Sequence, residues 1–237
     1  MKYITIFSFF IFFVSCHKDL SDCGKCFIGP MEGQPSTLLA DSVSTVLIEA
    51  DFNAGNLPKE QEVTFTTTNG DLFQFPFSDL SGGSKSLTFK PQSDKAVIVL
   101  RSSDIVDDQV FISFQRNNYT AHNTVRFVRA CPDELFLKSN VDTISARLNQ
   151  TATLEVELYR SAPNSVVSKD TRVEFAAILL DPGDMQVEFD TPVFSTGKAV
   201  ATTLRSKNGV PGKVTMIATV EDPCFVGSNT VIVEVKE

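Results

Sequence analysis

The chain has 237 residues and a formal net charge of −8, with 20 Phe, no Trp and only two His. An acidic chain without a basic patch is a poor ligand for nucleic acid and for anionic lipid surfaces, so the composition argues against both as docking partners. The length allows one large domain or two of ordinary size.

A short basic-then-apolar leader opens the chain. Its apolar run, Tyr3–Val14, is too short for the about 20 residues that a membrane-spanning helix needs. A small residue then precedes Cys16, which is the layout of a secretory signal. The run Phe13-Val14-Ser15-Cys16 resembles the lipobox of bacterial prolipoproteins, with Phe13 where that pattern usually has Leu. The resemblance implies a signal peptide over residues 1–15 and acylation of Cys16, for example with palmitate; an ordinary cleaved signal is the alternative.

Acyl chains on Cys16 would attach the protein to a membrane, which in a Gram-negative envelope means the inner or the outer one. His17, not an aspartate, directly follows Cys16. An aspartate there is associated with inner-membrane retention in some bacteria. We therefore expect the outer membrane and leave open whether the protein faces the periplasm or the cell surface.

The cysteine count supports export. Lipid on Cys16 takes one of the five cysteines and leaves an even set, which favours disulfides in an oxidising compartment. Cys131 and Cys224 are expected to pair and to join the first segment of a second domain to a late loop. Cys23 and Cys26 lie in a tether, residues 16–34, where a small disulfide is favoured over a redox motif or half of a zinc site.

After the tether the chain shows the pattern of β-strands almost throughout. Val46, Ile48 and Ala50 alternate with a second set of residues, which is the period of two that buries one face of a strand. The pair Asn69-Gly70 is typical of a turn between strands. No stretch has the long i, i+3, i+4 pattern of an amphipathic helix, so the sequence predicts an all-β protein.

The second half of the chain repeats the first. Four blocks recur in the same order and at similar spacing: Ser44–Phe52 and Thr151–Tyr159, Val63–Phe65 and Val173–Phe175, Leu100–Ser102 and Leu204–Ser206, and Asn123–Val125 and Asn229–Val231. Each unit fits a two-sheet sandwich of the immunoglobulin type. The predicted domains cover residues 35–130 and 131–237, with the boundary where Pro132 interrupts the strand pattern.

Five segments carry a resemblance to a known family. They are residues 38–52, 63–73 and 94–103 in the first unit, and residues 195–206 and 209–220 in the second. These segments resemble the bacterial immunoglobulin-like repeats of the invasin and intimin family. The resemblance implies two tandem immunoglobulin-like β-sandwiches; an adhesin-like role follows only by analogy, because one fold serves many functions.

Catalysis finds little support. His17 falls in the tether, and His122 is predicted to lie in a loop before the last strand of the first unit. Asp107 and Asp108 are adjacent, and adjacent residues of a strand point to opposite faces. No nucleophile elbow, zinc-binding HExxH or phosphate loop occurs. We therefore expect no enzyme, no cofactor and no metal site, since the acidic turns at residues 104–108 and 181–184 match no calcium-loop spacing.

One aromatic segment stands out as a candidate contact surface. Phe73, Phe75 and Phe77 share one strand face, and Pro76 indicates an edge strand. Core packing is the favoured interpretation, while exposure would create an apolar patch suited to a protein partner.

The sequence thus predicts a non-enzymatic, lipid-anchored envelope protein that acts as an adhesin-like binding or spacer module. Its partner would be an unidentified envelope or extracellular protein, or a glycan. The alternative is an accessory ligand-binding subunit of an outer-membrane nutrient-uptake complex that binds glycan or peptide.

Overall fold

The computed structural model describes residues 27–51, 61–76, 79–93, 95–116, 119–147, 149–180, 184–220, 224 and 227–237. Strands in the first half are β1 (Phe27–Pro30), β2 (Thr37–Ala40), β3 (Thr45–Asp51), β4 (Val63–Thr67), β5 (Asp71–Gln74), β6 (Ser86–Phe89), β7 (Lys95–Arg101), β8 (Asp107–Arg116) and β9 (Tyr119–Arg129). Strands in the second half are β10 (Glu134–Ser139), β11 (Thr143–Ser145), β12 (Thr151–Tyr159), β13 (Arg172–Leu179), β14 (Val187–Glu188), β15 (Val193–Phe194), β16 (Ala199–Ser206), β17 (Gly212–Val220) and β18 (Ser228–Lys236). The described residues contain no helix, in agreement with the all-β prediction.

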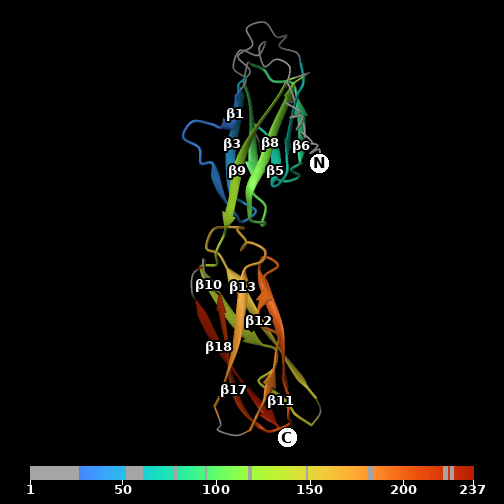
Figure 1. Ribbon diagram of the computed structural model, residues 1–237, viewed down its shortest axis with the longest axis vertical. Helices are drawn as coiled ribbons and strands as arrows, with labels where there is room; N and C mark the ends of the chain where they lie inside the picture. The colour runs from blue at the N-terminus through green and yellow to red at the C-terminus, as the bar shows by residue number, and fades with distance from the viewer. Residues whose placement is uncertain are drawn as a thin grey trace, which may run out of the picture.

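Four sheets pack in pairs and form two sandwiches (Figure 1). The first sandwich joins the sheets β1-β3-β7-β5 and β2-β9-β8-β4-β6, and the second joins β10-β12-β16-β14 and β11-β18-β17-β13-β15. The second pair of sheets therefore repeats the strand order of the first. The four repeated sequence blocks fall on equivalent strands, namely β3 and β12, β4 and β13, β7 and β16, and β9 and β18.

Each sandwich has its own hydrophobic core, built from the alternating positions of its strands. Phe65, Phe114 and Phe127 are almost fully buried in the first core, where the rings of Phe65 and Phe114 meet edge to face at 5.2 Å between centroids. The second core is mainly aliphatic, with Leu154 and Leu204 among its fully buried members. Burying one such side chain contributes about 1.5–3 kcal/mol to the free energy of folding, so each core stabilises its own sandwich.

Two local predictions were wrong. The predicted tether extended to residue 34, yet Phe27–Pro30 already pair with β3 because the Ile28 side chain reaches the first core and is only 3% exposed. His122, predicted in a loop, lies within β9 opposite Ser113. The hairpin of β8 and β9 continues to the pair Arg116–Tyr119, so the ladder extends past the histidine.

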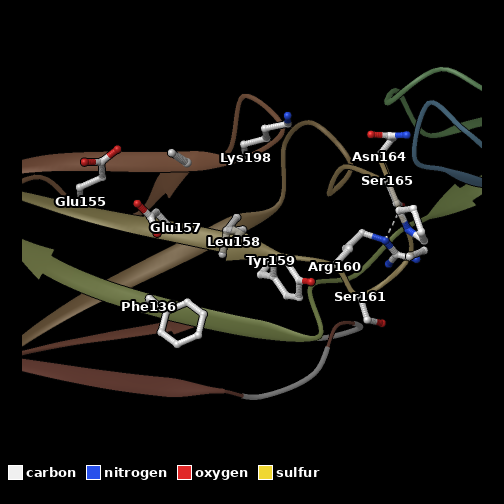
Figure 2. A pocket seen from close by; sticks show the side chains of 13 residues that line it. Phe136, Glu155, Glu157, Leu158, Tyr159, Arg160, Ser161, Asn164, Ser165 and Lys198 are labelled. Carbon is white, nitrogen blue, oxygen red and sulfur yellow. Dashed lines mark hydrogen bonds between the residues drawn. The ribbon is translucent and has the colours of Figure 1, made fainter.

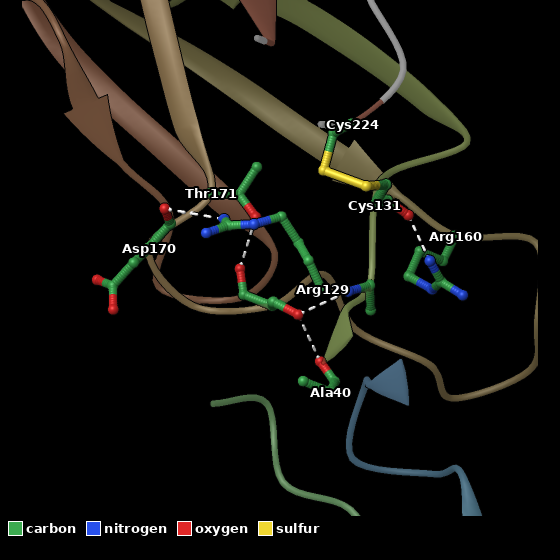
Figure 3. The surroundings of a disulfide bond; sticks show 9 residues. Ala40, Arg129, Cys131, Arg160, Asp170, Thr171 and Cys224 are labelled. Atoms are coloured by element: carbon green, nitrogen blue, oxygen red, sulfur yellow. Dashed lines mark hydrogen bonds between the residues drawn. A yellow bond between two sulfur atoms is a disulfide. The ribbon is translucent and has the colours of Figure 1, made fainter. Parts of the chain in front are cut away.

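The two sandwiches meet end to end through a hydrogen-bonded contact that we call the junction (Figure 1). Ser168, fully buried, lies in the loop between β12 and β13 of the second sandwich. Its hydroxyl donates to the carbonyl of Ala40 in the first sandwich and accepts the amide of Ala130, each at 2.8 Å (Figure 3). The amide of Val166 donates to the carbonyl of Asp41 at 3.1 Å. Backbone groups at both ends are thereby satisfied by the neighbouring sandwich.

A second set of contacts lies beside the first in the junction. The amide of Lys169 donates to the carbonyl of Asp104 at 2.7 Å, and the two side chains form an ion pair at 3.2 Å. The guanidinium of Arg129 donates to the carbonyl of Asp170 at 3.2 Å (Figure 3). The loop between β12 and β13 is therefore bound both to the end of the first sandwich and to its last strand.

Asp41 lies at the centre of the junction and is only 2% exposed. Its carboxylate accepts the amides of Val43 and Ser44 and, at 3.2 Å each, the hydroxyls of Ser102 and Ser165. Burial acts to raise the pKa of Asp41, but the hydrogen bonds from Ser44, Val43 and Ser165 outweigh it and hold the pKa below its ordinary value. The junction thus contains a charged carboxylate whose partners come from both sandwiches.

Candidate functional site

A groove of about 610 Å³ runs along the flank of the second sandwich, next to the junction (Figure 2). We call it the flank groove. Its lining comes from β10, β12, β16 and the loop after β12, and consists of Phe136, Glu155, Glu157, Leu158, Tyr159, Arg160, Ser161, Ala162, Pro163, Asn164, Ser165, Lys198 and Ala199. The volume lies within the about 300–1,000 Å³ that is usual for sites of small ligands.

Two aromatic rings form the apolar part of the flank groove. In β10 and β12 the buried phase is occupied by aliphatic residues such as Leu135 and Leu158, which turns Phe136 and Tyr159 outward. Phe136 is 43% exposed and Tyr159 is 52% exposed. Phe136 pairs with Glu157 and Tyr159 with Glu134 in the ladder, so the two rings are diagonal neighbours on one sheet face.

Charged side chains of both signs surround the rings. Glu157 is paired with Lys138 of β10 at 2.7 Å. The side chains of Glu155 and Lys198 are both exposed, and neither has an ion pair or hydrogen bond to another side chain of the described part of the chain. The flank groove therefore offers one free acceptor group and one free donor group beside the two rings.

Internal hydrogen bonds hold the loop that forms one wall of the groove. The guanidinium of Arg160 donates to the hydroxyl of Ser165 at 2.8 Å and to the carbonyl of Cys131. The amide and the hydroxyl of Ser161 both donate to the carboxylate of Asp133, each at 2.7 Å. The backbone bond from Ser161, followed by its hydroxyl, lowers the pKa of Asp133. The wall is therefore formed before any ligand arrives.

A disulfide joins Cys131 to Cys224, with the two Cα atoms 5.0 Å apart (Figure 3). It connects the first segment of the second sandwich to the region before β18, and Cys224 is 5% exposed. Because Arg160 binds the carbonyl of Cys131, the bridge also lies behind the wall of the flank groove. The other cysteines, Cys16, Cys23 and Cys26, lie outside the described residues.

The aromatic segment singled out in the sequence does not form an exposed face at Phe73. This ring is 7% exposed, lies 4.9 Å from the guanidinium carbon of Arg101 and packs against Gly83, where a Cβ would come within 2.5 Å of the ring. The loop after β5 therefore covers it. Phe75 is 44% exposed but lies beyond β5, and Phe77 lies outside the described residues.

The acidic positions considered for a cation have other partners. Asp104 pairs with Lys169 in the junction, and Asp108 pairs with Arg126 at 2.9 Å. Asp107 accepts the amide of Gln109, and Asp181 lies outside the described residues. Within the described ranges, no three His, Cys, Asp or Glu side chains are grouped to hold a metal ion. That part of the chain also has no helix long and apolar enough to cross a membrane.

No family model matches the chain, and no curated protein matches it by sequence. Among solved structures it is similar to the adhesin InvE of Yersinia pseudotuberculosis, with 14% identity and a TM-score of 0.56 over 90% of this chain and 58% of that one. It is also similar to invasin, a bacterial integrin-binding protein, with 18% identity and a TM-score of 0.55 over 89% of this chain and 39% of that one. The chain thus spans less than two thirds of either protein. At these identities the likeness concerns the fold, and the chain accordingly consists of immunoglobulin-like β-sandwiches of the kind found in these bacterial adhesins.

Proposed function

We propose that this chain is a non-enzymatic envelope protein that is anchored by lipid on Cys16 and carries a binding site on the side of a rigid spacer. The observation that carries the proposal is the junction, in which backbone and side-chain hydrogen bonds join the two sandwiches end to end. Contacts between domains within one chain commonly permit relative motion. A junction with a buried, satisfied carboxylate opposes such motion and suits a spacer.

The direction of the chain supports the same proposal. Phe27, at the start of β1, pairs with Asp51 at the end of β3, while the opposite end of β3 lies beside the junction. Figure 1 shows the C-terminus at the far end of the second sandwich. Lipid on Cys16 would therefore hold the first sandwich near the membrane and extend the second, with its flank groove, away from it.

An adhesin-like role is the binding function we propose for this spacer. InvE is described as an adhesin and invasin as an integrin-binding protein, and both share the sandwich fold with this chain. The flank groove gives such a role a defined surface, since its aromatic rings and free charged groups are exposed on one face.

The anchor can be tested in the bacterium that produces the protein. Palmitate labelling and membrane fractionation of the Cys16→Ala variant should show loss of label and release of the protein, because the acylated thiol is gone. Cys26→Ala is the matched control and should keep both. Continued labelling of the Cys16→Ala variant would refute the anchor.

The binding role can be tested by photo-crosslinking on intact cells. A photoreactive residue in place of Glu155, in the flank groove, should give a discrete adduct, while one in place of Thr230, an exposed residue of β18, should not. An adduct with an outer-membrane transporter would favour the nutrient-uptake alternative. Absence of any adduct from the groove position would refute a binding role there.

A further inference from the structure

We propose that the flank groove binds a neutral carbohydrate chain, with Tyr159 and Phe136 stacking on sugar rings and Glu155, Asn164 and Lys198 bonding to their hydroxyls. This inference rests on the binding role proposed above and names its ligand class. The rings of the flank groove are not those of the aromatic segment that the sequence singled out as a candidate contact surface, in which Phe73 is buried.

The two exposed aromatic rings of the groove suit the apolar faces of sugar rings. The face of an aromatic ring carries partial negative charge, and the C–H-rich face of a pyranose ring presents apolar, slightly positive hydrogens, so the two surfaces attract each other. Tyr159 and Phe136 expose about half of their surfaces to solvent on one sheet face. Diagonal neighbours of this kind lie about 7–8 Å apart, so an extended ligand can cover both rings.

The polar side chains of the groove can form hydrogen bonds with sugar hydroxyls. A sugar hydroxyl both donates and accepts, and the groove supplies an acceptor in Glu155, a donor in Lys198 and both functions in Asn164. Hydrogen bonds in which one partner is charged are the stronger ones. Lys138 lies opposite Glu155 in the ladder but pairs with Glu157, and the side chains of Glu155 and Lys198 form no ion pair within the described residues, so both are available to a ligand.

The balance of charge in the groove favours a neutral ligand over a strongly charged peptide. The charged side chains that line the groove are Glu155 and Glu157 on one side and Arg160 and Lys198 on the other, so neither sign dominates. A strongly acidic or basic peptide would meet repulsion from one half of this set. A neutral ligand rich in hydroxyls meets no such penalty. The groove is also a local hollow, whereas a stable protein–protein interface usually buries about 800 Å² on each partner.

The loop that forms one wall of the groove is held in place by hydrogen bonds within the protein. Arg160 already donates to the hydroxyl of Ser165, and Ser161 already donates to the carboxylate of Asp133. Asn164 lies between Ser161 and Ser165 with a φ of 59°, a left-handed conformation that asparagine adopts more readily than most residues. A fixed wall lowers the ordering cost of binding, which matters most for the weak contacts that hydroxyls make.

The test uses the mature protein and a panel of soluble neutral hexasaccharides (maltohexaose, cellohexaose, mannohexaose and xylohexaose), with an oligolysine and an oligoglutamate peptide as charged probes. Saturation-transfer NMR should detect at least one hexasaccharide, with weak affinity, and neither peptide. The Tyr159→Ala variant should weaken binding at least about tenfold, as expected for loss of an aromatic anchor. The Tyr159→Phe variant should retain most of it, because the ring face remains. Phe194→Ala is the matched control, since Phe194 is 53% exposed on the other sheet, and should bind like the unchanged protein.

Three results would overturn the inference: no hexasaccharide binds, binding survives the combined Phe136→Ala and Tyr159→Ala changes, or a charged peptide binds in their place. A protein adduct from residue 155 on intact cells, together with no hexasaccharide binding, would reject the carbohydrate and leave the binding role standing. Loss of the adduct as well would reject both. Because both aromatic side chains are exposed, thermal unfolding of each variant should match that of the unchanged protein, which separates lost binding from lost folding.

Discussion

Asp41 is a carboxylate that the fold buries and keeps charged. The cost of removing it from water is offset by hydrogen bonds from two backbone amides and several hydroxyls. Among these donors, Ser165 belongs to the second sandwich, so the charge state of one residue bears on the contact between the two units. Acid that protonates Asp41 therefore acts on the junction as well as on the first sandwich.

The pH dependence of stability follows from this arrangement. The folded-state pKa of Asp41 is lower than the about 3.9 of the unfolded chain, so its contribution is fully present above that value and is lost as the pH falls through the folded-state pKa. Asp41→Asn should reduce the free energy of unfolding by about 1–3 kcal/mol at pH 7. Urea unfolding should show this difference shrinking below about pH 4.

The control for this prediction is Asp142→Asn, which changes an exposed aspartate in the second sandwich. It should leave the unfolding free energy nearly unchanged at pH 7. A constant difference between the unchanged protein and Asp41→Asn down to pH 2 would contradict the assignment of a buried, charged Asp41.

At the scale of strands, the repeated sequence blocks preserve contacts as well as strand phase. Asn123 of β9 donates its side-chain amide to the carbonyl of Ile28 in β1 at 2.7 Å. Its counterpart Asn229 of β18 donates to the carbonyl of Leu135 in β10 at 3.4 Å. In each sandwich the asparagine thus links the last strand (β9 or β18) to the first strand (β1 or β10), which lies in the other sheet. The arginines of the other repeated block pair with an acid on the neighbouring strand, at Arg101–Asp71 and Arg205–Glu188.

Removing the first of these connections should loosen β1. In the Asn123→Ala variant the carbonyl of Ile28 loses a donor in a partly buried place, which should cost about 1 kcal/mol of unfolding free energy. Amide hydrogen exchange should become faster in β1 before the rest of the first sandwich. Thr124→Ala, at the exposed neighbouring position, should change neither quantity. Uniform acceleration across the sandwich would contradict a local role.

The strands could be predicted from the sequence, because alternation in segments such as β12 directly reports which face is buried. The flank groove could not. Phe73 and Tyr159 both point away from the core of their sandwich, yet a loop and Arg101 cover the first and nothing in the described chain covers the second. That difference depends on where a distant loop packs, which local periodicity does not encode. Ser168 was missed for the same reason, since a serine in a loop gives no sign of its partner in another unit.

At the scale of the whole molecule, the junction decides whether two sandwiches act as one body. Its contacts combine backbone hydrogen bonds with side-chain bonds from Ser165, Ser168 and Arg129. The ion pair of Lys169 and Asp104 adds to them. Exposed ion pairs contribute only about 0–1 kcal/mol, whereas the fully buried hydroxyl of Ser168 forms hydrogen bonds with two backbone groups, the amide of Ala130 and the carbonyl of Ala40. Rigidity should therefore depend more on the serine than on the lysine.

Nitrogen-15 relaxation of the mature protein tests whether the junction is rigid and whether Ser168 contributes more to that rigidity than Lys169. If the junction is rigid, amides in both sandwiches should report a single overall tumbling time, because one elongated body rotates as a unit. Ser168→Ala should leave the amide of Ala130 and the carbonyl of Ala40 without their shared partner, and the tumbling times of the two sandwiches should then separate and shorten. Lys169→Ala should have a smaller effect. Lys138→Ala, which removes an ion pair on the flank of the second sandwich, should have none. Separate tumbling times in the unchanged protein would show that the sandwiches move independently and would remove the basis for a spacer.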